Sequence, residues 1–112
     1  MSLATSPVSD MAVTVKSREV QRGMQCEMSG RTTDAKRHFM AAAHLELVLS
    51  RDYQEAGEQT LSRRSTLSAV SCFWRAGETT RAQGILSDLM SSDPLATDAA
   101  QELLDEFQSH RP

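Results

Sequence analysis

The hexamer "GRTTDA" at residues 30–35 recurs as "GETTRA" at residues 77–82, and this repetition decides the fold class. Each copy lies between two segments whose apolar residues recur with helical spacing. The glycine can adopt the left-handed conformation that ends many helices, and a threonine hydroxyl can cap the amide groups of the next helix. The alanine, Ala35 or Ala82, then falls where the two helices approach each other. The repeated hexamer therefore predicts two helical hairpins.

The hydrophobic pattern predicts an all-α chain. The expected helices cover residues 10–28, 33–50, 62–76, 80–91 and 95–108, with a break and a linker in the polar stretch 50–62. The helix at 33–50 is apolar on almost every side, so we expect neighbours to cover more than one of its faces. The helix at 95–108 has an apolar side that can cap the last hairpin, and an acidic side.

The length of 112 residues is typical of one domain. Residues 1–9 contain Ser, Thr and Pro without a period, which predicts a flexible N-terminus. Residues 10–112 are then expected to form a single helical domain.

Composition and charge argue against several classes of function. The formal net charge of −3 disfavours a nucleic-acid partner. No apolar stretch is long enough for a membrane span, so we expect no membrane partner. Cys26 and Cys72 are too few and too far apart for a metal motif, and in a chain without a signal peptide two reduced thiols are favoured over a disulfide. These features predict a cytoplasmic protein without a metal or cofactor.

Two stretches of the chain resemble the tetratricopeptide repeat. The resemblance in residues 63–94 rests on Phe73, Gly77, Ala82, Leu86 and Asp93-Pro94, and in residues 16–47 on Gly23, Gly30, Ala35, Phe39 and Ala42. Glu19 and Thr66 replace the early aromatic residue of the family pattern, and Leu47 stands where the family places proline. The resemblance implies two antiparallel helical hairpins plus a C-terminal capping helix, arranged as a tetratricopeptide-like α-α superhelix.

Two such repeats bury little surface on their own. Three solutions stay open: the last helix caps the array, the chain forms a homodimer, or another chain completes the apolar helix at residues 33–50.

The resemblance also implies where a partner binds, because in the family the inner face of the first helix of each hairpin contacts partners. The matching positions are Val20, Met24, Glu27 and Met28 in the first hairpin, and Arg64, Leu67, Ser71, Trp74 and Arg75 in the second. We expect a non-enzymatic protein–protein interaction or scaffold module, self-association included, that binds a helix or an extended, somewhat acidic peptide. Two other interpretations stay open: Trp74 can be a core residue, and the acidic side of residues 95–108 can neutralise the arginines within the fold.

The segment "RTTDAKRH" at residues 31–38 supports an alternative function. Its arginine-then-histidine spacing is similar to that of some helical ribonucleases, which makes Arg31 and His38 the candidate residues of a small nuclease or hydrolase. The segment overlaps the first hairpin turn, and the chain contains no glycine-rich phosphate loop. We therefore predict no catalytic residue and keep the enzyme as the alternative. His44, inside the apolar run, is expected to be a hydrogen-bonded core or boundary residue.

Overall fold

The computed structural model describes residues 7–109, and these residues form helices joined by short turns. The elements are α1 (Pro7–Met28), α2 (Thr32–Glu55), α3 (Gln59–Arg75), α4 (Thr79–Ser92), the 3-10 turn η1 (Pro94–Ala96) and α5 (Thr97–Ser109). No strand occurs within these residues. The prediction of an all-α chain is therefore confirmed.

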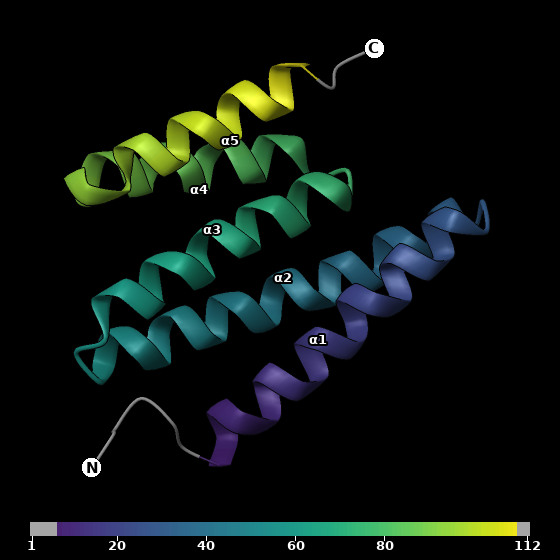
Figure 1. Cartoon of the computed structure of the whole chain (residues 1–112), viewed down its shortest axis with the longest axis horizontal. Coiled ribbons are helices and arrows are strands. Elements are labelled where there is room, and N and C mark those ends of the chain that lie inside the picture. The colour runs from purple at the N-terminus through teal and green to yellow at the C-terminus, as the bar shows by residue number, and fades with distance from the viewer. Residues whose placement is uncertain (1–6, 110–112) are drawn as a thin grey trace.

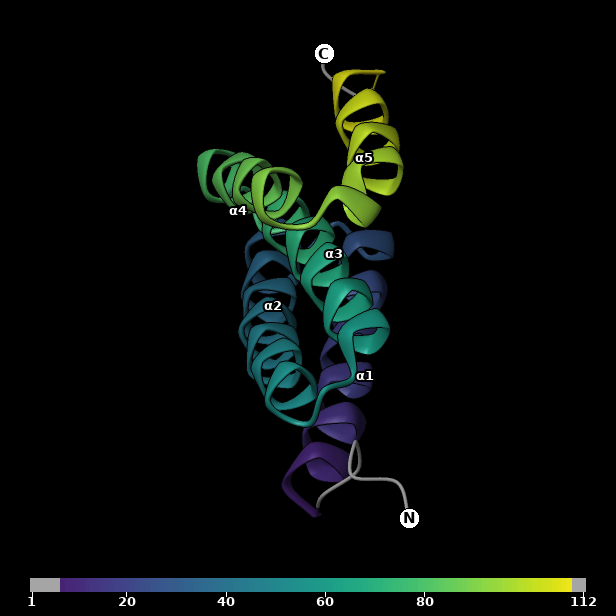
Figure 2. The same cartoon turned by 90° about the vertical axis from the view of Figure 1, so that its left-hand side faces the viewer.

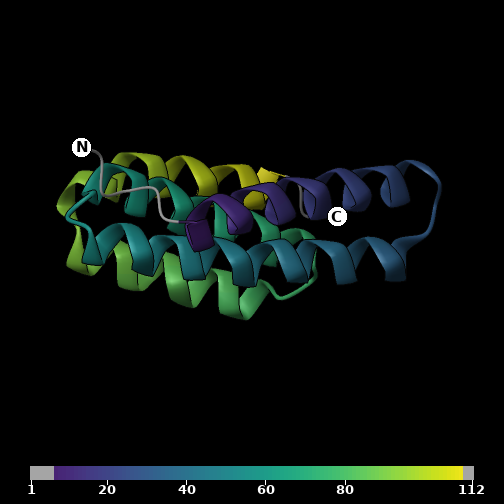
Figure 3. The ribbon, with the colours of Figure 1, turned by 90° about the horizontal axis from the view of Figure 1, so that it is seen from below.

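The helices stack side by side in chain order, each antiparallel to the one before it (Figure 1). Figure 2 shows that α1, α3 and α5 lie on one side of the stack and that α2 and α4 lie on the other. The same two layers are visible from below (Figure 3). The molecule measures 44 × 30 × 16 Å, and α2 packs against both α1 and α3. This position confirms that neighbours cover more than one face of the apolar helix.

Three turns of identical design connect the first four helices. Gly30, Gly57 and Gly77 have φ angles of 74°, 78° and 84°, in the left-handed region that favours glycine. At the last of these turns, the amide of Gly77 donates to the carbonyl of Trp74 and the amide of Glu78 donates to that of Phe73. This pair of bonds is the Schellman motif, and equivalent bonds occur at the other two turns.

The turn at Gly57 corrects the expected linker. The polar stretch 50–62 is helical except at residues 56–58, so α2 extends through Glu55 and α3 already begins at Gln59. Polar residues in this stretch reflect exposure on helix surfaces, which the hydrophobic pattern alone did not distinguish from a loop. The two hairpins are therefore joined by one more tight turn and no linker.

The expected threonine caps are also wrong. Arg31 and Glu78 occupy the N-cap positions of α2 and α4, and neither helix has a side-chain cap. Thr32 and Thr79 are instead the first helical residues, because the Schellman turn needs only one residue between its glycine and the next helix. In contrast, the carboxylate of Asp93 accepts a hydrogen bond from the amide of Leu95 and caps η1.

The first helix begins earlier than predicted. Pro7–Ser9, expected in a flexible terminus, form the first residues of α1 instead. Proline is favoured at this position because it needs no amide partner there and its φ angle already suits a helix. The rest of the expected flexible segment, residues 1–6, lies outside the described residues.

Small residues and phenylalanines form the core. Ala35 and Ala82 are buried, which confirms that the alanines of both hexamers lie at helix contacts, and Phe39, Phe73 and Leu86 are fully buried beside them. Alanine at these contacts lets neighbouring helices approach closely while the larger side chains fill the space between them.

Candidate functional site

The predicted residues of α3 lie on one side of that helix. Arg64, Leu67, Ser71 and Arg75 recur at intervals of three and four residues, whereas Ser65, Ala69 and Cys72 are buried. Leu67 and Ser71 line a groove against α5, and Arg75 reaches α1. We name this surface, which α3 shares with α1 and α5, the inner face.

The groove between α3 and α5 has a volume of about 280 Å³. Its lining residues are Leu67, Ser68 and Ser71 of α3 and Ala99, Glu102, Leu103 and Glu106 of α5. The floor therefore combines aliphatic side chains with two hydroxyls. Both carboxylates come from α5.

Trp74 packs against another residue of the same chain. Its indole stacks on the ring of Phe107 in α5, with the ring centroids 4.0 Å apart and the planes at 3°. Trp74 is half-buried, whereas Phe107 is buried. One face of the indole thus holds α5 against α3, and only the remainder of the side chain borders the inner face.

Arg75 ties three helices together. Its Nη2 lies 2.7 Å from Oε1 of Glu27 on α1, and its guanidinium lies 4.3 Å from the centroid of the Phe39 ring on α2. Its ion-pair partner therefore comes from α1 and not from the acidic side of α5. Arg64 is exposed and forms no ion pair with the described residues.

The predicted methionines of α1 are accessible. Met24 is 46% exposed and Met28, the last residue of the helix, is 87% exposed. Val20 is partly buried and packs against the core. The predicted positions of α1 therefore run from the partly buried Val20 to the exposed C-terminal end of the helix at Met28.

A buried charge that the sequence analysis missed lies beside the inner face. Glu46 of α2 is only 4% exposed, and its Oε2 lies 3.6 Å from Nζ of Lys16 on α1. Burial raises the pKa of this carboxyl, while Lys16 and hydrogen bonds from Ser68 and Ser65 oppose the increase. The only sequence signal was a single glutamate inside the run "FMAAAHLELVL".

Both cysteines are buried and neither forms a disulfide. Burial, together with the nearby charge of Glu46, raises the pKa of the Cys72 thiol to about 11. At neutral pH this thiol is therefore protonated and a poor nucleophile.

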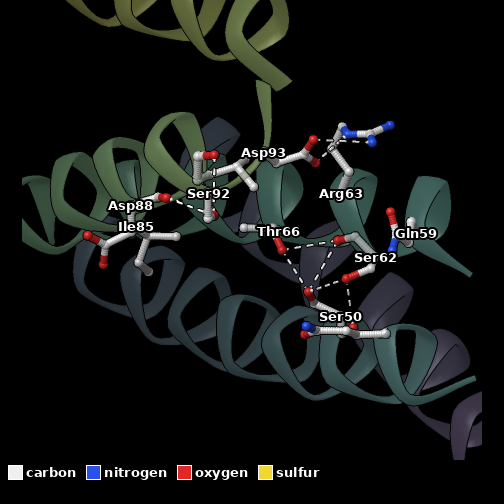
Figure 4. Close-up of a pocket in the computed structure, with 11 residues that line it drawn as sticks. Ser50, Gln59, Ser62, Arg63, Thr66, Ile85, Asp88, Ser92 and Asp93 are labelled. Carbon is white, nitrogen blue, oxygen red and sulfur yellow. Dashed lines mark hydrogen bonds and ion pairs between the residues drawn. The ribbon is translucent and has the colours of Figure 1, made fainter. Parts of the chain in front are cut away.

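A pocket of about 420 Å³ opens where α2 and α4 end and α3 begins (Figure 4). Ser50 Oγ lies 2.6 Å from Thr66 Oγ1 and 3.1 Å from Ser62 Oγ. Ser62 also donates to the carbonyl of Ser50, and Thr66 donates to that of Ser62. These hydroxyls form hydrogen bonds with one another and with backbone carbonyls, so the cluster links α2 to α3.

An ion pair lies at the edge of this pocket. Nε of Arg63 is 2.7 Å from Oδ2 of Asp93, so the start of α3 is linked to the residue that caps η1 (Figure 4). The hydrogen bond from Arg63 holds the pKa of the Asp93 carboxyl below its usual range. The sequence analysis did not predict this arginine partner of Asp93.

The structure does not bring the candidate enzyme residues together in a pocket. Nδ1 of His38 lies 2.6 Å from Oε2 of Glu19 on α1, while Arg31 is exposed at the start of α2. Neither residue lines the groove between α3 and α5, the pocket at the start of α3, or a third pocket that Thr33 and Met40 of α2 form with Ala76. His44 is exposed and its ring contacts the buried Phe73 edge to face, so of the two expected places it lies at the boundary of the core and not inside it.

Residues 7–109 contain no group of three or more His, Cys, Asp and Glu side chains arranged to hold a metal ion. Within the same part of the chain, every helix is too short or too polar to span a bilayer. Comparison of the chain with models of protein families, with curated proteins and with solved structures finds no match.

Proposed function

We propose that the chain is a non-enzymatic protein-interaction module with tetratricopeptide-like stacking, which binds a segment of a partner protein on its inner face. One observation carries the proposal: Leu67 and Ser71 line a groove, and the exposed Arg64 lies on the same side of α3. The alternation of helices between two layers also supports it, because such a stack places α1, α3 and α5 on the same side of the molecule (Figure 2).

The residues of the inner face indicate which side chains of a partner can bind there. An aliphatic side chain fits between Leu67 and Leu103, where it is removed from water. An acidic side chain of the partner then faces Arg64, one helical turn before Leu67 on the same side of α3. If the segment bound in the opposite direction, its acidic side chain would face the carboxylate of Glu102 and be repelled. Arg64 and Glu102 together therefore determine the direction in which the segment binds.

Site-specific photo-crosslinking tests the proposal. A benzophenone amino acid replaces Ser71 in one version of the protein and the exposed Ser87 of α4 in the other. We expect a partner, a second copy of the chain included, to crosslink at position 71 and not at position 87. Equal crosslinking at both positions would argue against a binding surface on the inner face.

Affinity measurements with the purified crosslinked partner complete the test. Leu67→Ser and Arg64→Glu should each weaken binding by about 1–2 kcal/mol, whereas Arg51→Glu on α2 should leave it unchanged. If all three variants bind equally well, the inner face is not the interface. If the chain crosslinks to itself, the same variants should shift the monomer–dimer equilibrium in sedimentation experiments.

A further inference from the structure

The basic segment at the start of α2 lines a pocket that the proposed inner face does not use. Thr33, Lys36 and Arg37 line this pocket together with Met40 and with Ala76 at the end of α3, and its volume is about 350 Å³. The first three residues belong to "RTTDAKRH", the segment that suggested an enzyme. The inner residues of that segment, and not Arg31 or His38, therefore share a cavity.

Three of the five residues that line the pocket carry hydrogen-bond donors, and two of these three carry a positive charge. Lys36 and Arg37 are exposed and form no ion pair with the described residues. None of the five lining residues is acidic, and the neighbouring Asp34 is not part of the lining. Thr33 adds a hydroxyl, so the polar part of the pocket presents a lysine, an arginine and a threonine.

The Lys36 side chain is placed by the turn after α3. A β-carbon at position 77 would lie 3.5 Å from both Cε and Nζ of Lys36, so the lysine lies across the glycine turn. Its ammonium therefore lies close to the turn that contains Ala76 and Gly77. Thr33 and Arg37 also lie on α2, so all three donors that line the cavity come from this helix, and Ala76 borders it from the turn after α3.

We propose that this pocket binds the phosphate monoester of a small organic molecule. A phosphate monoester carries a charge of about −1.5 to −2 at neutral pH, which two cations balance. Its three terminal oxygens can accept bonds from an ammonium, a guanidinium and a hydroxyl. Met40 and Ala76 supply an apolar surface for the organic group.

Nuclear magnetic resonance titration of the full chain with phenyl phosphate, with inorganic phosphate and with phenol tests the assignment. We expect saturable shifts of the amides of Thr33, Lys36 and Ala76 with phenyl phosphate. Inorganic phosphate should bind about tenfold more weakly because it lacks the apolar group, and phenol should cause no saturable shift. Equal affinity for the two phosphates, or shifts spread over all exposed arginines, would overturn the proposal.

Variants and vesicles separate this ligand from other sources of the same chemistry. The double variant Lys36→Gln/Arg37→Gln should lose at least about tenfold in affinity for phenyl phosphate, whereas Arg51→Gln on the same helix should keep it. All three positions are exposed, so circular dichroism should show the same fold for each variant. Unchanged affinity in the double variant refutes the site. Sedimentation with phosphatidic acid vesicles that depends on Lys36 and Arg37 would assign the pocket to a lipid headgroup and refute the small molecule.

Discussion

Glu46 shows how a single residue can fix the packing of three helices. Among residues 10–109 it is the one charged side chain that is buried, and its partners come from α1 and α3. Removing a carboxylate from water is costly unless a counter-charge and hydrogen bonds replace the solvent. Lys16, Ser65 and Ser68 replace part of the lost solvent, and they link Glu46 to α1 and α3.

The raised pKa of Glu46 predicts a specific pH dependence. Because the folded pKa lies above the unfolded value near 4.5, the stability contributed by protonation is fully present below pH 4.5 and is lost as pH rises through the folded pKa. Glu46→Gln does not titrate, so its stability relative to the natural protein should increase from acidic to neutral pH. Urea unfolding of both proteins across this range measures the difference. A difference that is independent of pH would contradict the buried charge.

Cys72 should react slowly with alkylating reagents. With a pKa of about 11, its thiolate fraction at pH 8 is roughly 100-fold smaller than that of a thiol with the ordinary value of 9.0. We expect modification by iodoacetamide to be slower by at least this factor in the folded protein than in urea, because burial also restricts access. Peptide mapping by mass spectrometry separates Cys72 from Cys26. Equal rates in both states would show that the thiol is exposed.

At the scale of the helices, the glycines have two different structural roles. Gly30, Gly57 and Gly77 supply the left-handed turns, whereas Gly23 lies inside α1 and brings that helix close to α2. A β-carbon at position 23 would lie 2.9 Å from Cε2 and Cζ of Phe39. Since Phe39 is fully buried, its ring has little room to move.

Two glycine substitutions separate these effects. Gly84 lies in α4, and a β-carbon at this position would have no neighbour within 4 Å, so Gly84→Ala should stabilise the protein by about 0.5–1 kcal/mol. Gly23→Ala gains the same helix propensity but overpacks Phe39, and we expect a net loss of about 1–2 kcal/mol. Chemical denaturation measures both values. If Gly23→Ala were as stabilising as Gly84→Ala, the close contact between α1 and α2 would be wrong.

The sequence predicted the helices more accurately than the turns and contacts that connect them. Glycine and alanine in the two hexamers indicated turns and contacts correctly, because backbone conformation and close packing restrict those positions to few residue types. The turn at Gly57 lacks the Thr-Thr pair and was not recognised as a third copy. The contact between Lys16 and Glu46 joins residues far apart in the chain, and no local pattern encodes such a pair.

At the scale of the molecule, the two ends of the stack differ. The apolar side of α5 is covered, with Ala100 and Phe107 buried against the preceding helices. The first helix carries Met11, Val13, Val15, Met24 and Met28, which form most of the exposed large hydrophobic side chains among residues 10–109. Periodicity predicted that the last helix would cover the hairpin, but the stacking of Trp74 on Phe107 depends on tertiary packing that a single sequence does not reveal.

The capping role of α5 can be measured through this ring pair. Phe107 is buried and stacks on Trp74, the single tryptophan of the chain, so Phe107→Ala should destabilise the protein by about 3 kcal/mol and expose the indole. Urea unfolding followed by tryptophan fluorescence and by circular dichroism reports both effects. Gln108→Ala, at the exposed neighbouring position, is the control and should change stability by less than about 0.5 kcal/mol. If Phe107→Ala unfolds at the same urea concentration as this control, α5 does not cap the stack, and the apolar surface of α3 must be covered by another molecule instead.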